Sequence, residues 1–296
     1  MNTMTDAKQT PPRTAHYPRI LSIAGSDSGG GAGIQADLKT FSALGCFGMT
    51  AITAITAQNT VGVRAIHGVP PEMLKAQIQA VVEDIGVDAV KIGMLHSVET
   101  VQVVAWAIRH YRLPNVVLDP VMVATSGDAL ITRDAVKVLV DELFGLASVI
   151  TPNLDEADLL LGRKITGIDA LEVAANDLLA MGAQAVLLKG GHLQGDEVVD
   201  VLVQPGQNCL RLSSQRIESR NVHGTGCTLS SAIAAHLALG LDLAQAVTHA
   251  RSYVLGAIAA GAGVHTGQGH GPLNHGYAPK PLRVLSPSLR AKRGNP

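Results

Sequence analysis

The stretch from residue 221 to 231 has the residue types best suited to chemistry in this chain. Gly224 and Gly226 precede an apolar run at helical spacing, which predicts a glycine turn that opens a helix. The first N–H groups of a helix lack internal partners and lie at the positive end of its dipole, so Gly224, Thr225 and Gly226 are candidates for an anion cradle. Cys227 falls in the first turn, where a thiolate is stabilised. An anion cradle beside a potential base suits phosphoryl transfer, and the alternative is a helix start with a structural cysteine.

The rest of the chain alternates between predicted strands and predicted helices. Short β-branched or apolar runs predict strands at residues 19–24, 49–57, 89–94, 115–122, 148–151 and 185–189, and a hairpin at 198–204 and 209–213. Helical spacing predicts helices at residues 34–44, 70–84, 97–111, 132–144, 169–181, 228–239 and 243–260, with a short helix after residue 156. This order implies an α/β fold in which helices cover both faces of a mostly parallel sheet, with antiparallel strands at an edge.

Polar and glycine-rich clusters follow the predicted strands. In mostly parallel sheets a ligand binds beyond the carboxyl ends of the strands, so one rim of the sheet can hold all of these clusters. They lie at residues 25–33, 58–60, 93–94, 119, 153–156, 189–192 and 223–227.

The glycine loop at residues 25–33 resembles a nucleotide-binding loop only superficially. Its glycines do not fall into a clean G-x-G-x-x-G register, and no lysine followed by Ser or Thr completes a P-loop. We therefore expect a loop whose backbone approaches a ligand closely, because glycine removes the side chain that would keep the ligand away.

The composition of the 296-residue chain argues against several classes of protein. A net charge of −1 and an aromatic content of 3% argue against a nucleic-acid partner. Cys46, Cys209 and Cys227 lack the spacing of a zinc site and are odd in number, which argues against a disulfide framework. The first 20 residues have no apolar signal segment, and the longest nearly apolar run, at 253–264, is too short to span a bilayer. We expect a cytoplasmic protein that acts on a small molecule, with neither nucleic acid nor membrane as partner.

Seven collinear motifs resemble those of the bacterial hydroxymethylpyrimidine/phosphomethylpyrimidine kinases of thiamine biosynthesis. The motifs lie at residues 24–39, 57–60, 91–95, 118–122, 150–157, 188–192 and 223–228. The resemblance runs from about residue 19 to residue 272. It implies a ribokinase-like fold with three α/β/α layers and a mostly parallel central sheet with antiparallel edge strands. A single kinase domain at 19–285 is expected between a disordered tail at 1–18 and a flexible tail at 286–296, and a homodimer is expected.

The same resemblance implies an activity and a substrate pocket. Members of this family use ATP and Mg²⁺ to phosphorylate the hydroxymethyl group of the pyrimidine and then the monophosphate. By resemblance Gly25, Asp37, Gln58 and Met94 line the pyrimidine pocket. Cys227 takes the position of the aspartate base of sugar kinases with this fold. Without the resemblance, the sequence predicts ordinary structural roles for three of these residues. Met94 would belong to the core, Gln58 would form a turn, and Asp37 would be a solvent-exposed carboxylate on a helix.

The remaining candidates concern the nucleotide and the metal. By resemblance Lys189 and Asn153 contact ATP together with Thr225, and Glu156 lies near the phosphates and Mg²⁺. Asp119, at the end of a predicted strand, is a second candidate for the metal, with a structural turn as its alternative. Asn153 and Glu156 also have the spacing of an ordinary helix cap. Lys189 also suits a salt bridge at the rim of the sheet.

Two other functions remain open from the sequence. Pyridoxal kinase shares the fold and the hydroxymethyl acceptor, so it is the nearest alternative. A catalytically silent nucleotide-binding regulator is the alternative from a different class, although the complete motifs at 153–156 and 224–227 argue against it.

Overall fold

The computed structural model describes residues 15–122 and 130–286. The strands are β1 (Arg19–Asp27), β2 (Phe47–Gln58), β3 (Val63–Gly68), β4 (Ala89–Ile92), β5 (Val116–Leu118), β6 (Val149–Ile150), β7 (Val186–Lys189), β8 (Glu197–Val203) and β9 (Leu210–Gln215). The helices are α1 (Gly33–Ala43), α2 (Pro71–Asp84), α3 (Val98–Tyr111), α4 (Arg133–Leu143), the 3₁₀ turn η1 (Phe144–Leu146), α5 (Leu154–Leu161), α6 (Ala170–Ala180), α7 (Thr225–Ala238) and α8 (Leu243–Gly261). Most of the tails predicted at 1–18 and 286–296, namely residues 1–14 and 287–296, lies outside the described residues.

The strands of the described ranges form one nine-stranded sheet in the order β3-β2-β1-β4-β5-β6-β7-β8-β9. The neighbours from β2 to β7 are all parallel, whereas β3, β8 and β9 are antiparallel. The predicted mostly parallel sheet is therefore confirmed, and its antiparallel strands lie at both edges.

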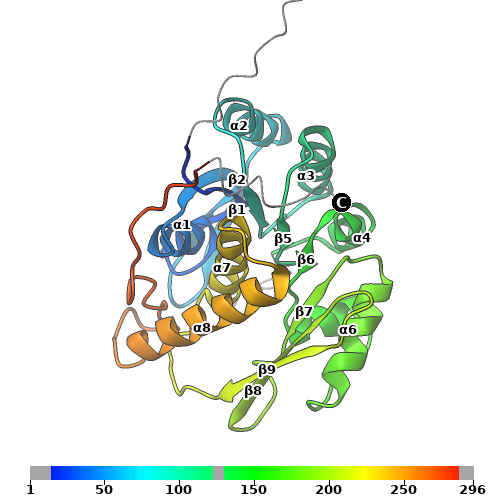
Figure 1. Ribbon diagram of the computed structural model, residues 1–296, viewed down its shortest axis with the longest axis vertical. Helices are drawn as coiled ribbons and strands as arrows, with labels where there is room; N and C mark the ends of the chain where they lie inside the picture. The colour runs from blue at the N-terminus through cyan, green and yellow to red at the C-terminus, as the bar shows by residue number, and fades with distance from the viewer. Residues whose placement is uncertain (1–14, 123–129, 287–296) are drawn as a thin grey trace, which may run out of the picture.

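Helices cover both faces of the sheet, as Figure 1 shows. One face carries α1, α7 and α8, and the other carries α2 to α6. Successive residues of a strand point to opposite faces, so Leu21 and Ile23 join the core beneath α2 to α6, while Ile20 joins the core beneath α1, α7 and α8. No helix in the described ranges has the length and apolar character needed to cross a bilayer.

Several elements differ from the sequence predictions. Strand β3 was not predicted, because its residues are mostly exposed and do not alternate; pairing with β2 holds it in place. Strand β5 ends at Leu118 rather than at residue 122, since Pro120 has no N–H with which to continue the ladder. Residues 15–18, assigned to the tail, include His16, whose backbone pairs with that of Leu285 at 3.2 and 2.8 Å.

A buried ion pair attaches α8 to the hairpin formed by β8 and β9. The Arg251 Nε donates to Asp200 Oδ2 at 2.8 Å, and Arg251 Nη2 donates to the carbonyl of Val198 at 2.8 Å. The other carboxylate oxygen of Asp200 accepts the N–H of Gly190 at 2.9 Å. Because Gly190 follows Lys189 directly, this network also fixes the end of β7.

We expect Arg251→Ala to lower the free energy of unfolding by about 3–5 kcal/mol, because it leaves the buried carboxylate of Asp200 without its cation. Urea unfolding measures the change. Arg163→Ala is the matched control: it breaks an exposed pair with Asp177 and is expected to cost only about 0–1 kcal/mol. Equal losses in the two variants would contradict the role given to Arg251.

Candidate active site

The carboxyl ends of the parallel strands meet at one rim of the sheet. Strand β1 lies between β2 and β4, so the chain leaves β1 toward one side of the sheet and later continues on the other side. Such a reversal of strand order is where ligands bind in open α/β sheets. The glycine loop after β1 and the turn before α7 meet at this rim.

Contact between two glycine segments brings the turn and the loop together. Gly224 has a φ of +83°, a left-handed conformation that glycine adopts without strain. A Cβ at this position would lie 1.9 Å from the carbonyl oxygen of Gly31, so no other residue fits. The glycines of the 224–226 turn therefore allow the start of α7 to pack directly on the loop that follows β1.

Helix α7 begins three residues earlier than predicted, at Thr225. The Thr225 amide and hydroxyl both donate to the carbonyl of Val222, at 3.2 and 2.7 Å. Thr225 therefore uses its amide inside the turn, and its place in the anion cradle and its contact with ATP stay predictions. Thr228 makes the first i→i−4 bond of the helix, at 2.8 Å. The amides of Gly226 and Cys227 precede that bond and lie at the positive end of the helix.

A lysine side chain lies beside the start of this helix. The Lys189 Nζ donates to Asp119 Oδ1 at 2.9 Å, so the salt bridge considered from the sequence is formed. A Cβ at Gly226 would lie 3.2 Å from the same Nζ. The ammonium of Lys189 thus lies beside Gly226 at the N-terminus of α7, and a cation next to a helix N-terminus suits a phosphate.

The carboxylates beside Lys189 differ in their electrostatics. Burial raises the pKa of Asp119, but the charges of Lys189 and Lys91 outweigh burial and hold the pKa below its usual range. Burial raises the pKa of Glu156 to about 7, because the attraction of Lys189 is partly cancelled by the repulsion of Asp119. Burial lowers the pKa of Lys189, but Asp119 and Glu156 raise it above its usual value. Asp119 and Lys189 are therefore a stable ion pair, whereas Glu156 changes charge near neutral pH.

Asn153 and Glu156 form the helix cap that their spacing predicts. The Asn153 Oδ1 accepts the amide of Glu156 at 2.9 Å, and Glu156 Oε2 accepts the amide of Asn153 at 2.8 Å. Both side chains therefore stabilise the start of α5. Contact of Asn153 with ATP stays a prediction, and the bonds that Asn153 and Glu156 make serve the helix.

The pKa of the Cys227 thiol is higher than the sequence predicts, since the position of Cys227 at a helix start predicts a stabilised thiolate. Burial raises its pKa to about 11. The charge of Lys91 and the N–H of Gly33 lower the pKa, while Asp37 raises it, and together these groups do not overcome burial. At the start of α7 the loss of water outweighs the helix dipole, which explains why the expectation from position alone is wrong.

Three of the four residues predicted for the substrate pocket lie at one end of the rim. A Cβ at Gly25 would lie 2.7 Å from Met94 Cε, so the glycine makes room for the methionine. Gln58 ends β2 and is half-buried. Asp37 is fully buried beneath this end: Ser22 Oγ donates to one carboxylate oxygen at 2.6 Å and Lys91 Nζ lies within 3.0 Å. Contact of Asp37 with a ligand stays a prediction, since its side chain has no exposed surface here.

Lys91, whose role was not predicted from the sequence, forms a fully buried ion pair with Asp37. The Lys91 Nζ lies 2.9 Å from Asp37 Oδ1, and both side chains have 0% exposure. Burial lowers the pKa of Lys91, but Asp37 and Cys227 raise it above its usual value, so the ammonium is retained. A lysine within an apolar strand was the available signal, because such a residue is almost never buried without a partner.

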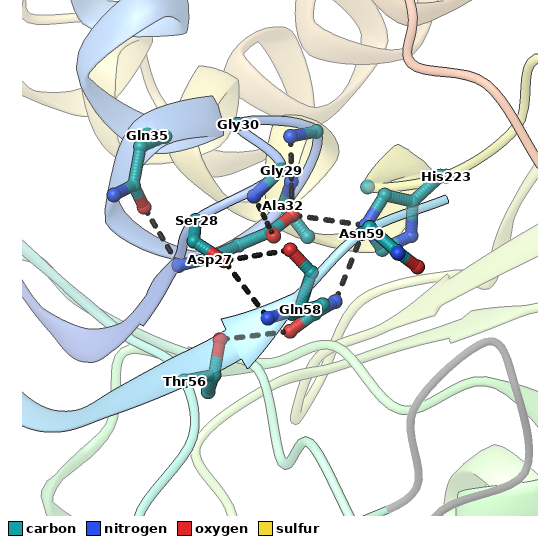
Figure 2. Close-up of polar contacts among 12 residues, drawn as sticks. Asp27, Ser28, Gly29, Gly30, Ala32, Gln35, Thr56, Gln58, Asn59 and His223 are labelled. Atoms are coloured by element: carbon teal, nitrogen blue, oxygen red, sulfur yellow. Dashed lines mark hydrogen bonds and ion pairs between the residues drawn. The ribbon is translucent and has the colours of Figure 1, made fainter. Parts of the chain in front are cut away.

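Asp27 and His223 were also missed as a connected pair (Figure 2). Asp27 accepts the amides of Gly29, Gly31 and Ala32 at 2.7, 3.1 and 2.8 Å, and lies 3.0 Å from His223 Nε2. Burial raises the pKa of Asp27, but the bonds from His223 and the amides outweigh burial and lower it. An aspartate inside a glycine loop after a buried strand was the available signal.

The polar side chains at the rim can supply only a few ligands for a Mg²⁺ ion. Among residues 15–122 and 130–286, no group of three or more His, Cys, Asp or Glu side chains has the geometry of a metal site. Asp119 and Glu156 supply two carboxyl groups beside the phosphate position. Mg²⁺ keeps several waters and uses one or two carboxylates together with substrate phosphates, so these residues fit the ion.

Comparison with known proteins identifies similar kinases. A model of the family described as phosphomethylpyrimidine kinase matches residues 27–274. The hydroxymethylpyrimidine/phosphomethylpyrimidine kinase of Rhizobium meliloti (strain 1021) is 56% identical over 257 residues, which cover 86% of this chain and 96% of the relative.

Two solved structures resemble the chain in fold. The phosphomethylpyrimidine kinase of Clostridium difficile 630 has a TM-score of 0.72 at 44% identity, covering 81% of this chain and 99% of that one. An ADP complex of Bacillus subtilis pyridoxal kinase has a TM-score of 0.81 at 38% identity, covering 88% and 98%. These likenesses confirm the predicted ribokinase-like fold. The family match covers far more than half of the sequence, and the chain belongs to the phosphomethylpyrimidine kinase family.

Proposed function

We propose that this protein transfers the γ-phosphoryl group of ATP to the hydroxymethyl group of 4-amino-5-hydroxymethyl-2-methylpyrimidine, and then transfers a second one to the monophosphate. The observation that carries the proposal is the position of the Lys189 ammonium beside Gly226, at the positive end of α7. The printed names of the relatives support the pyrimidine, and the family membership supports a place in thiamine biosynthesis.

Positioning and charge stabilisation are the main contributions of the protein to this reaction. Phosphoryl transfer passes through a loose transition state, so the enzyme needs little covalent chemistry. The amides of Gly226 and Cys227 hold the charge that develops on the transferred group, and donors of this kind contribute roughly 3–4 kcal/mol each. Lys189, kept in place by Asp119, binds the phosphate oxygens.

Cys227 is the candidate acceptor for the proton of the substrate hydroxyl in the first phosphorylation. Only its thiolate can take the proton. In the second phosphorylation the acceptor is already an anionic phosphate, so this step does not need the thiolate. Asp119 and Glu156 would hold Mg²⁺ together with waters, and the bound ion would neutralise part of the phosphate charge.

Pyridoxal kinase activity is the second candidate function. The observation that favours it is the likeness to the Bacillus subtilis pyridoxal kinase, which is solved with ADP. Pyridoxal also offers a hydroxymethyl acceptor on a heteroaromatic ring. The two functions differ in one respect, since only the pyrimidine kinase phosphorylates a monophosphate again.

We further propose a homodimer, and cytoplasmic location stays a prediction from the sequence. The edge formed by β2 and β3 exposes the apolar side chains of Ile55, Val61 and Ile66, at 54%, 66% and 40%. An exposed apolar sheet edge is typical of a surface that another chain covers.

The turnover assay uses four acceptors with ATP and Mg²⁺: hydroxymethylpyrimidine, its monophosphate, pyridoxal and ribose. We expect ADP release with the first two, because the site is proposed to bind the pyrimidine in both forms. A coupled ADP assay measures each rate. Turnover of pyridoxal without turnover of the pyrimidine monophosphate would replace the proposed function by the second candidate. Thermal stabilisation by ATP with no turnover on any acceptor would indicate the silent regulator.

The pH dependence of the two phosphorylations is expected to differ. A pKa of about 11 leaves roughly one Cys227 in ten thousand as thiolate at pH 7. If the thiolate is required, kcat of the first step rises between pH 7 and 9 toward about tenfold per pH unit, whereas kcat of the second step follows only the smaller change from groups that both steps share, such as Glu156. Cys227→Ala should abolish the rise in the first step and retain the second. A flat profile for the first step would remove Cys227 from the role of base.

Glu156→Gln tests the metal without removing the helix cap, because glutamine at this position still accepts the amide of Asn153. We expect the Mg²⁺ concentration for half-maximal activity to rise about tenfold, since one of two carboxylates is lost. Titration of activity with Mg²⁺ measures this change. The melting temperature should not fall, because a carboxyl group with a raised pKa is replaced by a neutral amide. An unchanged Mg²⁺ requirement would exclude Glu156 as a ligand.

A further inference from the structure

The segment between β7 and β8 is a glycine-rich loop at the rim of the sheet. It spans residues 190–196, follows Lys189 directly and contains neither helix nor strand. The imidazole Nδ1 of His192 lies 2.9 Å from Asp155 Oδ2, in the first turn of α5, which also carries Glu156. The loop therefore adjoins both Lys189 and the helix start that is proposed to hold the metal.

A single arginine holds this loop along its length. Arg216 follows the last residue of β9, and its guanidinium donates to the carbonyls of alternate loop residues. Nη1 donates to Gly191 at 3.0 Å, Nη2 to Leu193 at 2.5 Å and Nε to Gly195 at 2.7 Å. The backbone amide of Arg216 adds a bond to the carbonyl of Asp196 at 2.6 Å. Because the guanidinium is a planar and rigid fork, it fixes the three carbonyls relative to one another.

The loop has few other interactions that hold it in one conformation. Glycines at positions 190, 191 and 195 give its backbone many conformations in the free chain. Within the described parts of the chain, the only backbone bond inside the loop joins the Leu193 amide to the carbonyl of Gly190, at 3.0 Å. Asp200 accepts the amide of Gly190 at 2.9 Å and so anchors the beginning of the loop. The position of the remaining loop residues depends mainly on Arg216.

Two amides of the loop point away from the arginine. In a trans peptide the C=O and the following N–H point in opposite directions. Since the carbonyls of Gly191 and Leu193 face Arg216, the amides of His192 and Gln194 point to the other side. Neither amide has an acceptor in the part of the chain that the structure describes, so both donors are available to a ligand.

We propose that Arg216 is a positioning residue for the nucleotide, which holds residues 190–196 in the conformation that binds the phosphate groups of ATP beside Lys189. The described residues place no carboxylate within ion-pair distance of the Arg216 guanidinium, unlike those of Arg19, Arg109, Arg163 and Arg251, so its positive charge remains and favours an anionic ligand. This inference rests on the proposed function, because it takes the phosphate end of the rim as the nucleotide site.

The test measures the affinity of the full-length protein for ADP with Mg²⁺ by calorimetry, together with the KM values for ATP and hydroxymethylpyrimidine. We expect Arg216→Ala to weaken ADP binding and to raise KM for ATP by about tenfold or more, because a loop that is no longer held must be ordered when the nucleotide binds. The KM for the pyrimidine and kcat should stay within about threefold, since the acceptor does not contact this loop in the proposed site.

Arg109→Ala is the matched control. Arg109 is an exposed arginine in the last turn of α3 that donates to the carbonyl of Glu142 at 3.3 Å and pairs with its carboxylate. Its loss also removes one guanidinium and its bond to a carbonyl, but it should leave the affinity for ADP unchanged. Hydrogen exchange of the amides at 190–196 reports on the loop itself and should become faster in Arg216→Ala only.

Arg216→Lys separates the position of the loop from the charge beside it. Lysine keeps the positive charge, but a single ammonium lacks the planar fork that joins three carbonyls. We expect Arg216→Lys to remain at least about threefold weaker than the native protein in ADP binding, with faster exchange in the loop. Should Arg216→Ala fail to fold, this variant decides the test.

Three outcomes would overturn the inference and leave the proposed function intact. The first is native ADP affinity in Arg216→Ala, or in Arg216→Lys where the alanine variant does not fold. The second is full recovery of affinity by lysine, which would assign the effect to charge alone. The third is an equal rise in the KM values for ATP and the pyrimidine, which indicates a general loss of structure. A native protein that binds ADP but phosphorylates no pyrimidine would contradict the proposed function, whereas the ADP affinities of the variants would still decide the role of Arg216.

Discussion

Two lysine–carboxylate pairs hold the first turns of α7 against the sheet, and the site depends on them. Each pair binds one serine of the helix, in the chains Lys91–Asp37–Ser231 and Lys189–Asp119–Ser230. The Ser231 hydroxyl donates to Asp37 at 2.7 Å, whereas the Ser230 hydroxyl lies 3.3 Å from Asp119 and shares its hydrogen with the carbonyls of Gly226 and Cys227 at 3.0 and 3.1 Å. Both serines are fully buried. Ion pairs of this kind are costly to break singly, so they favour one placement of the helix start over neighbouring ones. The amides that we propose to bind the phosphate are thereby held in a fixed position relative to the strand ends.

The two pairs act on different parts of the site because they come from different strands. Lys91 lies on β4 and its partner Asp37 on α1, so this pair connects the substrate end of the rim to α7. Lys189 ends β7 and its partner Asp119 follows β5, so the second pair serves the phosphate end. A change in the position of α7 would disturb both ends together. Coupling of this kind suits a transfer reaction, in which acceptor and phosphoryl group must be aligned.

The layers of the fold and the location of the rim could be predicted from the sequence, because strand and helix periods are local. The contacts between distant segments across the rim could not be predicted from the sequence. Asp27 and His223 are 196 residues apart, and nothing in either segment shows that they meet. Strand β3 lacked a local signal, since its pairing with β2 rather than its own pattern makes it a strand. For Cys227 the local rule, a helix start that stabilises a thiolate, opposes burial, and only the packed structure shows that burial prevails.

The contribution of the Cys227 thiol to catalysis at neutral pH depends on the free-energy cost of its deprotonation and on the gain from a general base. Deprotonating a group with a pKa of about 11 at pH 7 costs about 5 kcal/mol, since each pKa unit is about 1.4 kcal/mol. A well-placed general base contributes about 10²–10⁴ in rate, or about 3–5 kcal/mol. The cost and the gain therefore nearly cancel at pH 7. The amides at the start of α7 and the Lys189 ammonium have no such cost, because they are in place before the reaction. In the proposed mechanism, most of the catalysis at neutral pH therefore comes from these amides and this ammonium, and the contribution of the thiolate grows as the pH rises.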